Sequence, residues 1–117
     1  MSIEVQGGVT LRFSADERLA AAAGGVARYY ADAAGMEGEA VAKLQRATVA
    51  VCLASFAPIP KTSDGLSVEI TRFADRIEVA VTRLGGPAEG IEALPGIDRI
   101  DRESRSGSSI IRLTKSL

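Results

Sequence analysis

The stretch Leu44–Ala57, LQRATVAVCLASFA, is the longest run of the sequence that is almost free of charge, with Arg46 as its one charged side chain. Its alanines favour a helix, whereas its valines alone would not. A helix that is apolar on nearly every side is expected to be buried on nearly every side. Pro58 and Pro60 end the run, which is shorter than the roughly 20 apolar residues that a membrane-spanning helix needs. We therefore predict a central helix, laid across a sheet and covered by a second helix.

Composition indicates one globular domain over residues 1–117, with 46% hydrophobic and 25% charged residues. The formal net charge is -1 and no basic stripe stands out, so we expect no nucleic-acid partner. The N-terminus lacks a basic region followed by an apolar one, as a signal peptide would have. Cys52 is the single cysteine and has no internal disulfide partner. These features predict a cytoplasmic protein.

The sequence contains no histidine. This absence excludes histidine-dependent zinc sites, as well as Ser-His-Asp and Cys-His nucleophilic catalysis by this chain. A single cysteine also excludes thiolate zinc sites. Cys52 lies within the apolar run, where burial would make it a packing residue rather than a reactive thiol. These absences exclude the metal sites and the nucleophilic catalysis that depend on histidine or on more than one cysteine.

The first part of the chain predicts a strand and two helices. Val9–Phe13 alternates apolar and polar residues, as a strand with one buried face does. Ser14 and Glu17 match a capping box that opens a helix reaching about Ala34. Gly24-Gly25 weakens that helix but allows a neighbouring helix to come close. The expected apolar stripe of this helix consists of Leu19, Ala23, Val26, Tyr30 and Ala33. Glu37 and Glu39 then open the second helix, where negative charge suits the helix dipole.

The second part of the chain predicts strands. Leu66–Thr71 and Ile77–Thr82 alternate with period two and form a hairpin across Ala74-Asp75. The glycine- and proline-rich stretch 84–96 has room for one helical turn near 88–94. Two further strands are expected at 97–103 and 109–114. The order is β-α-α-β-β-(short α)-β-β, which predicts an α+β, two-layer sandwich with two helices on one face of a mainly antiparallel sheet.

The run 34–55, AGMEGEAVAKLQRATVAVCLAS, resembles the nucleotide-binding helix of the anti-sigma-factor serine kinases. These enzymes belong to the GHKL superfamily, whose ATPase domains have the Bergerat fold. The final stretch, from Gly96 to Lys115, is similar to the last two strands of such domains. The resemblance covers about 9–117 and implies the same order of elements as the residue patterns do.

The residues that would hold a magnesium nucleotide in this family are replaced. The family's Glu and Asn, four residues apart on the helix, fall on Ala50 and Ala54. Its adenine-binding Asp falls on Thr82 or Arg83, and only Gly85 and Gly86 match the glycines that follow. Magnesium prefers oxygen ligands, which alanine does not offer. The resemblance therefore implies a degenerate domain with no catalytic residue, no metal and no cofactor, in which Ala50 and Ala54 have become core.

Three functions follow from the resemblance. The leading hypothesis is a non-catalytic regulatory module that binds another protein and has lost ATP binding. The first alternative is an active ATP-dependent anti-sigma serine kinase, with Glu37, Glu39 or Glu89 replacing the lost carboxylate. The second alternative is a structural homodimer subunit.

The resemblance also implies partners and a partner-binding surface. Candidate partners are a bacterial sigma factor, a STAS-type anti-anti-sigma protein or a related kinase-like subunit, and a homodimer is possible. Neither nucleic acid nor a membrane is expected. In the family the sheet edge and the first helix carry such contacts. The corresponding residues here are Val9, Leu11, Phe13, Asp16, Glu17 and Arg18.

Overall fold

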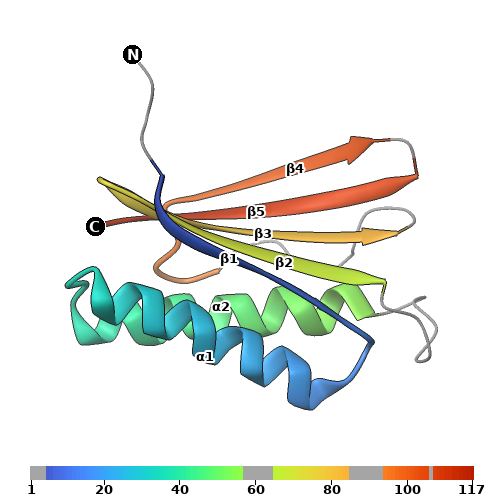
Figure 1. The fold of residues 1–117 in the computed structure, drawn as a ribbon, viewed down its shortest axis with the longest axis horizontal. Coiled ribbons are helices and arrows are strands. Elements are labelled where there is room, and N and C mark those ends of the chain that lie inside the picture. The colour runs from blue at the N-terminus through green and yellow to red at the C-terminus, as the bar shows by residue number, and fades with distance from the viewer. Residues whose placement is uncertain (1–4, 57–64, 85–93, 106) are drawn as a thin grey trace.

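A computed structural model describes residues 5–56, 65–84, 94–105 and 107–117 of the chain. The strands and helices within these ranges follow the predicted order (Figure 1). They are β1 (Val5–Phe13), α1 (Glu17–Ala33), α2 (Gly38–Phe56), β2 (Leu66–Phe73), β3 (Arg76–Leu84), β4 (Arg99–Arg105) and β5 (Ser108–Ser116). The predicted helical turn near 88–94 lies almost wholly outside the described residues.

The five strands form one antiparallel sheet in the order β1-β2-β3-β5-β4. Both helices lie on the same face of this sheet, and its other face has no covering layer among the described residues (Figure 1). The predicted α+β two-layer sandwich is therefore confirmed. The hairpin of β2 and β3 turns at the predicted Ala74-Asp75, where Leu66 pairs with Arg83 and Arg72 with Ile77.

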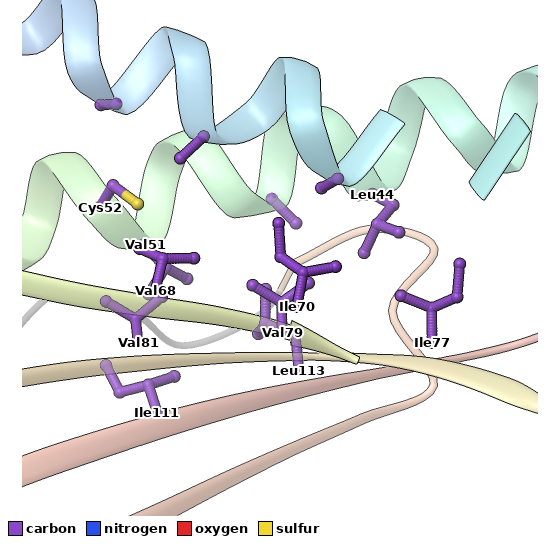
Figure 2. Packing of buried hydrophobic residues seen from close by; sticks show 14 of the residues in the cluster. Leu44, Val51, Cys52, Val68, Ile70, Ile77, Val79, Val81, Ile111 and Leu113 are labelled. Atoms are coloured by element: carbon purple, nitrogen blue, oxygen red, sulfur yellow. The ribbon is translucent and has the colours of Figure 1, made fainter. Parts of the chain in front are cut away.

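The core lies between the sheet and the helices. Side chains of a strand point alternately to the two faces. Those on the helix side are buried in β2 as far as Ile70, with Arg72 half-buried, and in β3 from Ile77 to Arg83. Figure 2 shows Val51 of α2 above Val68 and Val81. Leu44, on the same helix, lies closer to Ile77 than Val51 does. The largest side chains that are fully buried are Leu44, Leu66, Ile70, Ile77 and Leu113. The apolar stretch of α2 thus builds the centre of the core, as its sequence predicts.

Burial of α2 is nevertheless one-sided. Arg46, Ala50 and Leu53 are exposed, and the Leu53 side chain retains 42% of its accessible surface. The expectation of a helix buried on nearly every side is therefore wrong. The reason is geometric: the sheet covers one side of α2 and α1 covers a second, so a strip of the helix faces neither.

The start of α1 differs from the predicted capping box. Asp16, not Ser14, is the N-cap: its carboxylate accepts a hydrogen bond from the backbone N–H of Arg18 at 2.9 Å. The Ser14 carbonyl instead accepts from the backbone N–H of Asp16 at 2.8 Å. Two good capping residues stand two positions apart, and the turn that leaves β1 selects the second.

Replacing Asp16 with alanine is expected to lower the free energy of unfolding by about 0.5–2 kcal/mol, the usual loss for an N-cap. The same change at Ser14 removes no capping side chain and should cost less. Urea unfolding of the two variants checks this assignment. Equal losses, or a larger loss at Ser14, would restore the capping box.

The buried face of α1 also differs from the predicted stripe. Leu19 is exposed at 36%, Ala33 is exposed, and Val26 and Tyr30 are half-buried. The residues that face the core are Ala20, Ala23, Gly24, Ala27 and Ala31. Small side chains bring α1 close to α2, which explains why alanines rather than the larger residues turn inward.

Gly24 marks the closest approach of the two helices. A Cβ atom built there would lie 2.5 Å from Cγ2 of Val49 and 3.2 Å from the carbonyl oxygen of Gln45, both on α2. A Cβ built at Gly25 would meet no atom within 4 Å. The expected close approach of a helix is confirmed at the first glycine and absent at the second.

The two edges of the sheet have different chemistry. Residues 5–11 of the edge strand β1 carry no charged side chain, whereas β4 at the other edge reads RIDRESR. Charged edge strands resist pairing with other chains, and uncharged ones permit it. No helix in the described ranges is both long and apolar enough to cross a bilayer.

Candidate functional site

A pocket of about 270 Å³ opens on the exposed strip of α2. One wall is the helix, where successive turns place four residues on the same side. The other wall is the segment that leads into β4, which runs back toward α2 before entering the sheet (Figure 1). The lining residues are Lys43, Arg46, Ala47, Ala50, Leu94 and Pro95.

The second wall is fixed by its own turn and by the sheet. The backbone N–H of Ile97 donates to the Leu94 carbonyl at 3.2 Å, and Gly96 between them has φ of 80°. Next, the Asp98 carboxylate accepts from the backbone N–H of Ser116 at 2.6 Å. This hydrogen bond lowers the Asp98 pKa below its ordinary value. The segment is therefore tied to β5 immediately after it passes the pocket.

Gly96 is required where this segment meets α2. A positive φ of this size favours glycine, and a Cβ there would overlap the Cβ, Cγ and Cδ atoms of Lys43. The methylene chain of Lys43 thus packs against bare backbone. Its ammonium group forms an ion pair with Glu39, one turn earlier on α2, at 3.4 Å.

Ala50 and Ala54 lie near this pocket but in different surroundings. Ala50 is exposed and lines the pocket, whereas Ala54 is half-buried and packs against the core. The expectation that both had become core is thus wrong for Ala50. A methyl group at this position faces a cavity rather than the interior.

Magnesium prefers oxygen ligands such as carboxylates and amides. The described residues that line the pocket include no carboxylate and no side-chain amide, and their charged groups are both cations. Glu39 lies beside the pocket, but its side chain is 70% exposed and paired with Lys43. Glu37 is also exposed, and Glu89 lies outside the described residues. Within the described ranges no three potential metal ligands of the His, Cys, Asp and Glu types come together.

Thr82 and Arg83 point to opposite faces of β3. Thr82 is half-buried between Ser67 and Ile110 on the face without helices. Arg83 is 6% exposed and continues the helix-facing series of Val79 and Val81. Only Arg83 therefore shares a face of the sheet with α2. Gly85 and Gly86 fall outside the described residues.

The predicted partner-binding residues fall into two groups. The side chains of Val9, Leu11 and Phe13 turn toward the helices, and Phe13 is 7% exposed, with its ring 6.3 Å from that of Phe56. Val9 and Leu11 are half-buried and keep part of their surface, and the backbone of β1 forms one edge of the sheet.

Asp16, Glu17 and Arg18 form the second group, at the exposed start of α1. The Arg18 side chain is 90% exposed and its guanidinium lies 2.8 Å from the Asp16 carboxylate. Surface pairs of this kind contribute little to stability. Both charges thus remain accessible to a partner.

Sequence reasoning missed the other members of the pocket. Lys43, Arg46 and Ala50 stand at positions i, i+3 and i+7, so helical spacing alone places them on one side of α2. Their common exposure could have been inferred from the two charges. The contribution of Leu94 and Pro95 could not, because it depends on a loop that returns from the far part of the chain.

Cys52 lies on the opposite, fully buried side of α2. Desolvation raises its pKa from 9.0 to about 12. At pH 8 we expect no reaction with Ellman's reagent in the native protein and full reaction in denaturant. Between about pH 9 and 12 the Cys52 thiol loses its proton in the unfolded chain but keeps it in the native protein. The free energy of unfolding should therefore fall as the pH rises through this range. Rapid labelling of the native protein at pH 8 would contradict this burial.

No protein-family model and no curated protein sequence matches this chain. Among solved structures it is similar to the crystal structure of the RsbU and RsbW domains of Rv1364c from Mycobacterium tuberculosis. The TM-score is 0.77 with 16% sequence identity, over 94% of this chain and 32% of the other, so the chain spans about a third of that neighbour. A likeness at this identity shows the fold alone: two helices on a five-stranded antiparallel sheet.

Proposed function

We propose that this chain is a non-catalytic regulatory module that acts by binding another protein and does not use ATP. The chemistry of the α2 strip supports the proposal most directly. On an RsbW-like fold, that strip carries the methyl group of Ala50 and the cations Lys43 and Arg46. A magnesium nucleotide needs oxygen ligands at such a place.

The candidate partners come from the fold and from the sequence resemblance together. A domain of the RsbW type is expected to engage a sigma factor, a STAS-type anti-anti-sigma protein or a related kinase-like subunit. The β1 edge and the exposed start of α1 are adjacent along the chain. The first offers the outer backbone of β1, which pairs with no other described strand on that side and whose residues 5–11 carry no charge. The second offers Asp16, Glu17 and Arg18. Together they form the proposed partner-binding surface.

Calorimetric titration with Mg·ATP and Mg·ADP tests the loss of nucleotide binding. We expect no saturable binding at micromolar nucleotide. Saturable binding at micromolar concentration, accompanied by phosphorylation of a STAS-type protein, would instead favour the active kinase.

A charge-reversal pair tests the partner-binding surface. The purified chain is titrated with the sigma factors and STAS-type proteins of its own organism. Arg18→Glu should weaken the complex, whereas Arg99→Glu, at the opposite sheet edge and 72% exposed, should not. Equal effects of the two variants would reject this surface. A stable homodimer that binds none of these proteins would favour the structural subunit.

A further inference from the structure

The α2 pocket has the two-part chemistry of a site for a small organic anion. Ala47, Ala50, Leu94 and Pro95 supply an apolar lining, and two cations stand on the same helix. Pockets that enclose drug-sized ligands have roughly 300–1,000 Å³. At about 270 Å³ this one suits a smaller molecule.

The two cations differ in what they already bind. Arg46 is exposed and makes no hydrogen bond or ion pair with the described residues. Lys43 has one partner, Glu39, in an exposed i, i+4 pair that is weak in water. An ammonium group has three donors and a guanidinium has five, so both retain donors for an anion.

Lys43 is also held in place. Its methylene chain packs against Gly96, where the positive φ and the absent Cβ make room for it. A long lysine side chain loses conformational entropy when it is immobilised. Here part of that ordering exists before any ligand arrives, which favours binding.

We propose that this pocket binds a small phosphorylated molecule with an apolar or aromatic body, and that it does so without a divalent cation. Lys43 and Arg46 hold the phosphate, as charge-assisted donors commonly do. The apolar or aromatic body of the ligand contacts the methyl groups of Ala47 and Ala50 on one wall. On the other wall it contacts the Leu94 side chain and the Pro95 ring. The cations neutralise charge that a metal would otherwise neutralise. The site is separate from the β1 edge and the start of α1, so it does not depend on the proposed partner-binding surface.

An amide NMR titration with phenyl phosphate in the presence of EDTA tests the proposal. We expect shifts at Lys43, Arg46, Ala50 and Leu94, saturating in the millimolar range or below. Adding magnesium in place of EDTA should not tighten binding. Inorganic phosphate and phenol, each carrying half of the chemistry, should bind more weakly than phenyl phosphate.

Variants on the two walls separate the contributions. Arg46→Gln and Lys43→Met should each weaken phenyl phosphate by about tenfold, since a hydrogen bond to a charged group contributes about that much. Ala50→Phe should block the apolar part, while Arg99→Gln, at an exposed β4 residue that does not line the pocket, serves as the unchanged control. All four positions are at least partly exposed, and thermal unfolding confirms that each variant remains folded.

Several outcomes would overturn the proposal. One is the absence of amide chemical-shift changes at millimolar phenyl phosphate, and another is changes that map to a different surface. A third is an Arg46→Gln variant that binds phenyl phosphate as tightly as the unmodified protein does. Binding that requires magnesium would also overturn it. Tight binding of Mg·ATP by calorimetry would overturn the proposed function instead, and the two failures are therefore distinguishable.

Discussion

Leu44→Ala should lower the free energy of unfolding by about 2–5 kcal/mol, the range for a leucine removed from a packed core. Leu44 has no accessible surface and lies over the sheet beside Ile77 (Figure 2). Truncation removes buried apolar area and leaves a cavity between α2 and the sheet. A domain of this size is typically stable by only about 5–15 kcal/mol. The single change therefore removes a large part of the total.

Leu53→Ala is the matched control on the same helix. Leu53 keeps 42% of its surface, so its truncation should cost less than about 1 kcal/mol, near the range of surface changes. Urea unfolding with a common m-value measures both variants. Similar losses at the two leucines would mean that the exposed strip of α2 is covered in solution, for example by a second copy of the chain.

Gly24→Ala and Gly25→Ala are expected to change stability in opposite directions. Both replace glycine within α1, so both gain roughly 0.5–1 kcal/mol of helix propensity. Only the new methyl group at Gly24 collides, with Val49 and with the backbone of Gln45. Overpacking of this kind costs typically 1–3 kcal/mol, because the β-branched Val49 is stiff and the helices must separate.

Both variants gain the same helix propensity, so this gain cancels when their free energies of unfolding are compared. The remaining difference measures the cost of the collision at Gly24. We expect Gly25→Ala to be more stable than Gly24→Ala by about 1–3 kcal/mol. Thermal unfolding at fixed pH and concentration measures it. Equal stability of the two variants would show that α1 and α2 do not approach each other at Gly24.

Local sequence patterns were sufficient for the elements and their layers. Three local signals were enough, because each depends on residues that are close in the chain. They are the alternation of apolar and polar residues in β2 and β3, the nearly uncharged run of α2, and the turn at Ala74-Asp75. The two helices come early in the chain and most strands come late. A two-layer packing, with the helices on one face of the sheet, buries the apolar faces of both. The strand β1 starts at Val5 rather than Val9, because Gly7 and Gly8 pair with Arg72 and Thr71 despite their low strand propensity.

The errors arose where two local signals competed. Ser14 and Asp16 are both good N-caps, and the exit from β1 decided between them. On α1, larger side chains predicted one buried face, but the short distance to α2 selected the alanine face. The prediction that Ala50 is buried was wrong for a similar reason. An apolar side chain remains exposed where no other element packs over it.

The sequence by itself determined which segments are helix and strand, that both helices share one face of an antiparallel sheet, and that no magnesium ligand stands at Ala50 or Ala54. These properties depend on side-chain chemistry and on periods of a few residues. Only the tertiary structure decided that β5 lies between β3 and β4, and that Leu94–Gly96 returns to close a pocket over Lys43 and Arg46. The pairing of β3 with β5 and the contact of Gly96 with Lys43 join residues that lie far apart in the chain. Their energy is set by packing in three dimensions, which no local pattern encodes.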